Sequence, residues 1–305
     1  MPYRILSLDG GGIRGVLTIS LLQQLDREHP DFLDKVELVA GTSTGGILAL
    51  AIAAGKSLSQ ALKLYKEKGR QVFSDTPLDD LKDVGNAFGA EYSNEGLKQA
   101  LVEEFGSMTL GDLKKKVVIV SFDLDNDSVD PTVPRSWKPK IFQNYPGKGT
   151  DSGEKVVDVA LRTSAAPTYF PVYQGFIDGG VVANNPSMCA LAQALDKTTG
   201  CQKLSQLVLL SISTGGYPRF LTAQNADWGW TQWALPLVDI MLEGNIGVAD
   251  YQCRKLLGEY RYCRIAPKLN KQISLDSLEA IAELESIGTR YDIEKAVKFI
   301  KKHFV

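Results

Sequence analysis

The chain has 305 residues, of which 44% are hydrophobic and 23% are charged, and its formal net charge is −2. A chain of this size buries enough surface to hold a core without covalent staples. Its composition excludes a disordered chain, a collagen-like repeat and a disulfide mini-scaffold. The near-neutral charge offers no broad basic surface, so no nucleic-acid partner is expected.

The first part of the chain alternates short apolar runs with helical patterns. Ile5 to Leu8 predicts a strand, and apolar residues from Ile13 to Leu25 recur on one helical face before Pro30. Val36 to Ala40 predicts a second strand, and Ile47 to Ala54 predicts an apolar helix. Strand, helix, strand and helix in this order indicate a βαβ unit and a parallel sheet.

The remaining sequence continues this alternation, with a long Asp- and Pro-rich loop expected over Asp123 to Lys140. Further strands are expected at Val117–Phe122, Gly175–Ile177 and Leu207–Ile212, and helices at Ser59–Lys68, Asn94–Phe105, Lys155–Thr163, Pro186–Leu195 and Trp228–Leu257, with more helices up to the C-terminus. No linker separates independent cores. We therefore expect one α/β domain over residues 1–305, with a helical C-terminal part over about 228–305.

The sequence shows neither a targeting segment nor a membrane span. The N-terminus meets an acid at Asp9 and lacks the apolar core of a signal peptide. The longest apolar run, Ile47 to Ala54, is far shorter than the ~20 residues that cross a bilayer. The four cysteines have no C-x-x-C spacing, which favours a reduced compartment. We expect a cytoplasmic protein that meets membranes only at their periphery.

A glycine-rich loop follows the first predicted strand, where residues 9–15 read D-G-G-G-I-R-G. Its G-x-G-x-x-G spacing occurs in dinucleotide-binding folds, but the second strand here lacks the acid that would hold a ribose. At a helix N-terminus, the amides of Gly10, Gly11 and Gly12 can instead converge on one oxygen as an oxyanion hole. Arg14 in the first helical turn also favours a neighbouring anion. A tight packing turn is the alternative interpretation.

Residues 41–45 read G-T-S-T-G between a predicted strand and a predicted helix, the context of a nucleophile elbow. Such a turn holds Ser43 in a strained conformation, and the small Gly41 and Gly45 prevent clashes on either side. A P-loop is excluded because apolar residues stand where that motif needs Lys and Ser or Thr. The alternative role for Ser43 is that of a helix N-cap.

A nucleophilic serine needs a neighbouring base, and histidine is scarce in this chain. His29 lies at a predicted helix end and His303 near the C-terminus, and both are expected at the surface. Asp178 ends an apolar strand and precedes Gly179 and Gly180, so it can reach the edge of the sheet in a dry pocket. Such a pocket raises the pKa of a carboxyl group and makes it a better base. The alternative is a plain Asp-Gly-Gly turn.

Four motifs in this order resemble those of the patatin-like phospholipase family: the glycine loop at 9–15, the elbow at 41–45, the stretch S-A-A-P-T-Y-F-P at 164–171, and D-G-G at 178–180. The resemblance covers Tyr3 to about Leu210. It implies a three-layer α/β/α fold around a mainly parallel sheet, and hydrolysis of lipid acyl esters without metal or cofactor. Gly180 departs from the alanine that many members have there, and little beyond Tyr217 is recognisable.

Carried over residue by residue, the resemblance implies a Ser43–Asp178 catalytic dyad. The implied oxyanion hole is the loop Gly10, Gly11, Gly12 and Arg14, with structural support from Gly15, Gly41, Gly45, Gly179 and Gly180. The implied substrate is a phospholipid or another acyl lipid, met at a membrane or micelle surface. An acyltransferase that uses the same serine and a non-catalytic lipid-binding module are the alternatives.

Two weaker signals accompany these motifs. Asp123 to Asp127 begins like a calcium loop, but the glycine and glutamate that such a loop needs are missing, so no metal site is expected. Trp228, Trp230 and Trp233 lie close together in the sequence. They fit either aromatic packing in the core or a lid that contacts a lipid surface.

Overall fold

The computed structural model describes residues 1–72, 90–222 and 227–305. In this part of the chain a central sheet has the order β4-β3-β2-β1-β6-β7, and β5 also pairs with β3. The strands are β1 (Tyr3–Leu8), β2 (Leu38–Thr42), β3 (Lys116–Asp123), β4 (Lys138–Gln143), β5 (Phe176–Asp178), β6 (Leu207–Ile212) and β7 (Tyr262–Ile265). β4 and β5 are antiparallel to β3, and the other pairings are parallel.

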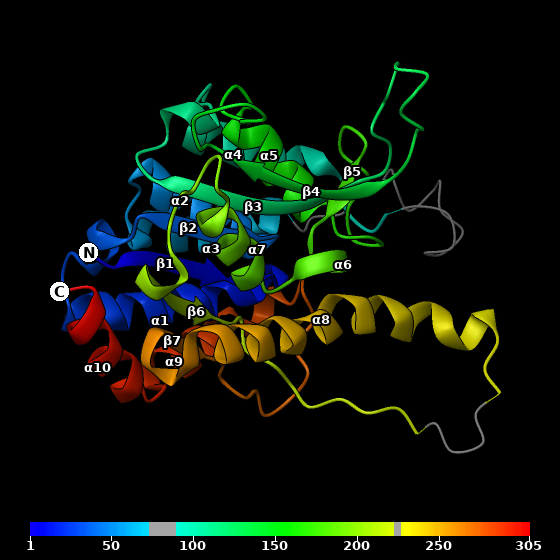
Figure 1. Cartoon of the computed structure of the whole chain (residues 1–305). Coiled ribbons are helices and arrows are strands. Elements are labelled where there is room, and N and C mark those ends of the chain that lie inside the picture. Colours follow the sequence, from blue (N-terminus) through cyan, green and yellow to red (C-terminus); the bar gives the residue numbers. More distant parts are fainter. Residues whose placement is uncertain (73–89, 223–226) are drawn as a thin grey trace.

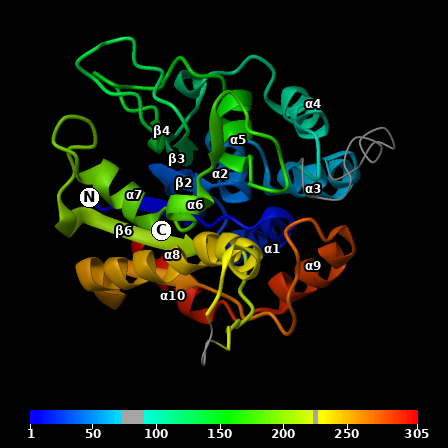
Figure 2. The ribbon, with the colours of Figure 1, turned by 90° about the vertical axis from the view of Figure 1, so that its right-hand side faces the viewer.

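Helices lie on both faces of this sheet (Figures 1 and 2). They are α1 (Gly15–Glu28), α2 (Thr44–Ala54), α3 (Leu58–Val72), α4 (Asn94–Phe105), α5 (Val156–Ser164), α6 (Gly180–Ala183), α7 (Ser187–Leu195), α8 (Trp230–Arg261), α9 (Ile281–Arg290) and α10 (Glu294–His303). Figure 2 shows α1, α2 and α5 on one side of the strands and α7 on the other.

The alternation of side chains along the strands creates two separate cores. Leu6 and Leu8 of β1 pack with α1 and α2 in the larger core, whereas Ile5 packs with α7 and the C-terminal half of α8 in the smaller one. The strands of the inner sheet are buried on both faces, as expected for parallel strands covered by helices. The predicted three-layer α/β/α architecture around a mainly parallel sheet is thus confirmed.

Two strands were not predicted from the sequence. β4 begins inside the segment expected to be a loop, because its first residues, Lys138 and Pro139, are exposed and carry no apolar alternation. β7 follows directly on α8, where the sequence around it is rich in charge. The predicted end of the long helix at Leu257 agrees with a break in the backbone at Gly258, where φ is 62°.

Candidate active site

Ser43 lies in the sharp turn between β2 and α2, as predicted for a nucleophile elbow. Its φ of 55° and ψ of −128° are rare for a residue with a side chain and indicate local strain. A Cβ atom on Gly41 would come within 2.2 Å of the Gly45 carbonyl oxygen. One on Gly45 would come within 2.3 Å of the Leu8 carbonyl oxygen. Gly41 therefore lets β2 pack closely against the start of α2, and Gly45 lets the turn pack closely against the end of β1.

Asp178 is the last residue of β5 and is only 2% exposed. In the parallel pairing Thr42 lies opposite Val120 of β3, and in the antiparallel pairing Asp178 lies opposite the next residue, Ser121. This register brings the carboxylate to the same edge of the sheet as Ser43. Two residues 135 positions apart in the sequence (178 − 43) thereby become neighbours.

The Asp178 carboxylate lies beside the Ser43 side chain in the wall of the same cavity, and the serine lowers the pKa of the carboxyl group. The carboxylate also accepts a hydrogen bond from the N–H of Gly180 at 2.6 Å. Burial raises the pKa of Asp178 to about 6, although Ser43 and the Gly180 amide lower it. A carboxylate with a pKa near neutrality is a stronger base than an exposed aspartate, and here it shares a cavity with a serine hydroxyl.

The glycine loop runs beside the serine. A Cβ atom on Gly10 would lie 3.2 Å from the Cβ of Ser43. The N–H of Gly10 donates to the Asn184 carbonyl at 3.0 Å, so this amide is already engaged. Within residues 1–72, 90–222 and 227–305, no hydrogen bond to protein engages the amides of Gly11 and Gly12. These two amides are the loop's candidates for binding a developing oxyanion.

Arg14 contacts both the glycine loop and α8. The Nε of its buried side chain donates to the Gly11 carbonyl at 3.3 Å, and its Nη1 lies 3.5 Å from a carboxylate oxygen of Glu243 on α8. Burial lowers the pKa of Arg14, while Glu243 opposes that effect. The anion that the sequence suggested beside Arg14 therefore includes a carboxylate of the protein itself.

The remaining predicted glycines lie around the same turn. Gly15 begins α1 and faces the Thr44 side chain, and Gly179 lies against the backbone of Val120 in β3. Gly180 supplies the amide that binds Asp178. All of the residues predicted for the site are thus brought together at the carboxyl ends of β1 and β2.

Two cavities meet at Ser43. The first is almost wholly apolar, with Ile13, Ile47, Leu64, Leu97 and Phe170 among its lining residues. The second has both apolar and polar walls, and its charged and polar lining residues include Arg14, Asp178, Asn184, Arg219, Asp239 and Glu243. The serine therefore lies between an apolar compartment and a charged one, the arrangement that an amphipathic ester requires.

Neither histidine belongs to this site. His29 contacts the Val297 carbonyl through its Nε2, at 3.2 Å. His303 is buried against the rings of Phe299 and Tyr260, so the expectation that it is a surface residue was wrong. In the described ranges of the chain, no group of three or more His, Cys, Asp or Glu side chains is arranged to hold a metal ion.

Several residues of the site carried no signal in the sequence. Asn184 and Leu275 act through backbone carbonyls, which accept the N–H groups of Gly10 and Ile13. A carbonyl contribution does not depend on residue type, so composition and motif cannot reveal it. Thr163 is different, because its hydroxyl accepts the N–H of Ser43 at 2.9 Å and it lies directly before the matched stretch at 164–171.

Comparisons with known proteins agree with the motifs. A model of the family described as patatin-like phospholipase matches residues 6–191. A cGAMP-activated phospholipase of Pseudomonas aeruginosa is 32% identical, over 90% of this chain and 81% of that protein. Patatin-like protein 2 of Arabidopsis thaliana is 29% identical, over 86% of this chain and 74% of that protein. The match to the solved structure of VipD from Legionella pneumophila covers 99% of this chain and 67% of the VipD chain, with 12% sequence identity and a TM-score of 0.45. Because the family model spans more than half of its length, the chain belongs to the patatin-like phospholipase family.

Proposed function

We propose that the protein is a lipid acyl hydrolase, a phospholipase of A type or a lysophospholipase, in which Ser43 is the nucleophile and Asp178 the base. The observation that carries this proposal is that Ser43 and the buried Asp178 carboxylate line one cavity, at its junction with a second, apolar cavity. Membership of a phospholipase family and the similarity to a cGAMP-activated phospholipase support the class of reaction.

The reaction begins when the Ser43 Oγ attacks the ester carbonyl carbon and its proton passes to the Asp178 carboxylate. The amides of Gly11 and Gly12 bind the oxyanion of the tetrahedral intermediate. The bond to the alcohol then breaks, the alcohol leaves with the proton from Asp178, and an acyl-enzyme remains. Water, deprotonated by the same carboxylate, releases the fatty acid and restores Ser43.

The two cavities suggest how the substrate lies. The fatty acyl chain fills the apolar compartment beside Ile47 and Leu64, and the polar alcohol part of the lipid fills the compartment walled by Arg219 and Asp239. Only a substrate with both parts would occupy both compartments. This arrangement favours phospholipids and lysophospholipids over small, uniformly polar esters.

The same geometry suggests that the protein acts at a lipid surface. Exposed apolar side chains lie beside the polar cavity: Tyr217, Phe220, Leu221 and Ile240 line the adjoining groove, and Trp233 and Leu237 precede Ile240 on α8 at helical spacing. We call these six side chains the apolar rim. Phe220 is 88% exposed and Trp233 is 41% exposed, whereas Trp228 is half-buried. The side chain of Trp230 lies outside the described part of the structure. Trp228 and Trp233 contact each other edge to face. Figure 1 shows the N-terminal half of α8 extending beyond the sheet.

We propose that this apolar rim contacts the surface of a bilayer or micelle during catalysis. It is continuous with the active site, since Arg219, Asp239 and Glu243 line both the groove under the rim and the polar cavity. In the described part of the chain, no helix is long and apolar enough to cross a bilayer.

The experiment that tests the function compares the wild type with Ser43→Ala and Asp178→Asn on defined phosphatidylcholine and lysophosphatidylcholine. We expect free fatty acid from the wild type only, and labelling of the wild type but not of Ser43→Ala by a fluorophosphonate. Ser20→Ala is the matched control, because Ser20 is fully buried on α1 and bonds only within that helix.

Turnover by a folded Ser43→Ala variant would overturn the proposal. Addition of an alcohol acceptor separates the remaining alternatives, because a new ester in place of fatty acid would identify an acyltransferase. Lipid binding without any product would identify a binding module.

A further inference from the structure

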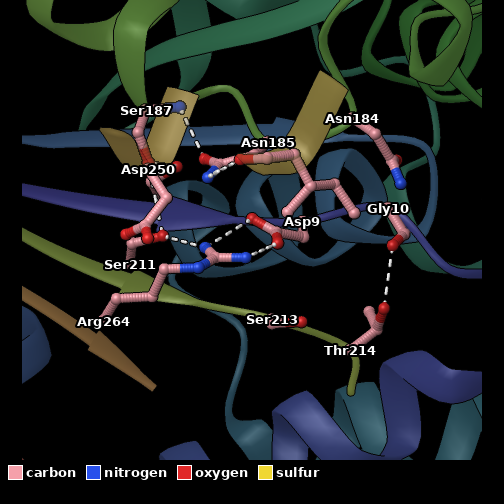
Figure 3. A network of polar contacts seen from close by, with 12 residues as sticks. Asp9, Gly10, Asn184, Asn185, Ser187, Ser211, Ser213, Thr214, Asp250 and Arg264 are labelled. Atoms are coloured by element: carbon pink, nitrogen blue, oxygen red, sulfur yellow. Dashed lines mark hydrogen bonds and ion pairs between the residues drawn. The ribbon is translucent and has the colours of Figure 1, made fainter. Parts of the chain in front are cut away.

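A buried ion pair lies at the start of the glycine loop (Figure 3). Asp9, the residue before Gly10, is fully buried, and the side chain of Arg264 on β7 is only 5% exposed. The two guanidinium nitrogens Nη2 and Nη1 contact the two carboxylate oxygens at 2.5 and 3.3 Å. Nη1 also donates to the Ser211 Oγ at 2.6 Å. The guanidinium group thus binds the carboxylate in a bidentate arrangement.

The sheet register explains how Arg264 reaches Asp9. Ser7 of β1 lies opposite Ser211 of β6, and Ser211 lies opposite Arg264 of β7. Three adjacent parallel strands therefore present one row of polar side chains on the same face. Ser187 of α7 contacts both serines of this row, at 2.9 and 3.3 Å. The guanidinium passes over β6 to the carboxyl end of β1, where the glycine loop begins.

Stability alone does not account well for such a pair. Removing a carboxylate and a guanidinium from water costs about as much as their mutual attraction returns, and apolar replacements are often neutral or better. Burial raises the pKa of Asp9, and Arg264 opposes that effect. What a two-armed pair does provide is a fixed geometry, and Asp9 is the residue whose position sets the backbone of Gly10.

The loop needs such fixation because three glycines in succession have little conformational preference of their own. Its start is held by the Asp9 N–H, which donates to the Ile212 carbonyl at 3.0 Å, and by the Thr214 hydroxyl, which donates to the Gly10 carbonyl at 2.8 Å. Its end is held by the Ile13 N–H, which donates to the Leu275 carbonyl at 2.7 Å. All of these partners lie beyond the match to the family model, which ends at residue 191.

We propose that Arg264 is a positioning residue for catalysis: by fixing Asp9 it holds the amides of Gly11 and Gly12 where the oxyanion forms. The inference rests on the proposed function, because it assigns those amides to the oxyanion. It also gives the C-terminal part of the chain a role in the reaction. A displacement of catalytic groups by about 1 Å can reduce turnover by on the order of 100-fold.

The test uses the full chain with the substitutions Arg264→Met, Arg264→Lys and Asp9→Asn. Turnover of a soluble p-nitrophenyl ester is measured below the unfolding temperature of each variant, with kcat and KM determined separately. We expect kcat to fall by about 10- to 100-fold in Arg264→Met with KM within about threefold, because an oxyanion donor acts mainly in the transition state. Arg264→Lys keeps the positive charge but loses the bidentate contact. We expect its kcat to lie between that of Arg264→Met and that of the wild type.

Arg4→Met is the matched control. Arg4 lies at the other end of β1, pairs with Glu37 at 3.1 Å and donates to the His303 carbonyl. Its removal tests the loss of an arginine tether on the same strand, away from the glycine loop, and is expected to lower the unfolding temperature without changing kcat.

Three outcomes would overturn the proposal: wild-type kcat in a folded Arg264→Met variant, an equal loss of kcat in Arg4→Met, or failure of all three test variants to fold. The last outcome would make the pair a determinant of folding only. Ser43→Ala measured in parallel keeps the two hypotheses apart. If it retains turnover, the proposed function fails, whereas full activity of the Arg264 variants beside an inactive Ser43→Ala rejects only the positioning role.

Discussion

The Thr163 hydroxyl joins the serine elbow to β3: its oxygen accepts the backbone N–H of Ser43 at 2.9 Å, and its hydrogen is donated to the Val120 carbonyl. Thr163 is fully buried on α5. The strained turn at Ser43 therefore depends on a side chain from a distant helix, which replaces the backbone partner that a strained residue lacks.

Thr163→Val should weaken both catalysis and folding. The variant leaves the N–H of Ser43 and the carbonyl of Val120 without partners, which costs about 1–3 kcal/mol of unfolding free energy. We expect kcat to fall about tenfold or more, because the elbow loses its fixed position. Denaturant unfolding and ester turnover measure the two effects. Thr163→Ser keeps both hydrogen bonds, so equal losses in Thr163→Ser would contradict this role.

The activity should depend on pH through Asp178. Only the ionised carboxylate can accept the serine proton, and burial raises the pKa of Asp178 to about 6. We expect kcat/KM to be constant above that pH and to fall about tenfold for each pH unit below it. A profile that bends near about 4, the pKa of an exposed aspartate, would show that the acting carboxylate is not in this dry environment.

The same group should make the protein less stable as the pH rises. Its pKa is 3.8 without the fold and about 6 in it, so the folded state binds more protons between these values, and the stability present at low pH is lost as the pH passes 6. The Asp178→Asn variant has no carboxyl group at this position, so it does not lose this stability as the pH rises. We expect the difference in unfolding free energy between Asp178→Asn and wild type to shift in favour of the variant by at most about 3 kcal/mol between pH 4 and pH 7. An unchanged difference would contradict the raised pKa.

Gly45→Ala should disrupt the elbow. The added Cβ would lie 2.3 Å from the Leu8 carbonyl oxygen and 2.5 Å from that of Asp9, both backbone atoms that cannot move aside. We expect loss of activity and destabilisation by more than ~3 kcal/mol. Gly247→Ala on α8 is the control, because nothing lies within 4 Å of its Cβ, and it should stabilise the protein by about 0.5–1 kcal/mol. Thermal unfolding of the two variants decides the comparison.

Phe220→Ser combined with Trp233→Ser should separate binding to lipid surfaces from chemistry. Both side chains belong to the apolar rim and are exposed, so their loss removes contact area with a bilayer. We expect at least about tenfold weaker binding to phosphatidylcholine vesicles, with turnover of a soluble ester unchanged. Trp137→Ser is the control, since Trp137 is 74% exposed outside the rim. Unaltered vesicle binding by the double variant would remove the rim from the proposal.

The sequence predicts the elements that have a strong apolar pattern. β3, a continuous run of β-branched and apolar residues, and the apolar helix α2 were both found near their observed bounds. β4 and β7 are not predicted, because short strands that contain charged residues give no clear apolar pattern. Their positions depend on pairing with β3 and β6, which is a property of the whole sheet.

The sequence predicts the site residues whose role depends on their chemical type. It does not predict those whose role depends on their place in the fold. Ser43 and Asp178 were named because a serine turn and a buried carboxylate have chemical signatures, and the structure brings them together. Arg264 could not be found in this way. Arg264 is one of several arginines in the C-terminal part of the chain, and no motif surrounds it in the sequence. Only the register of β1, β6 and β7 reveals that it faces Asp9.

The order of the strands also has a consequence for biosynthesis. β1 is made first but lies between β2 and β6, and β6 is completed only at Ile212. A growing chain on the ribosome therefore carries one unpaired edge of β1, with its apolar side chains, until that late segment emerges. Exposed edges of this kind invite pairing with other chains. The strand order thus leaves this edge of β1 open to wrong pairing throughout the synthesis of most of the sheet.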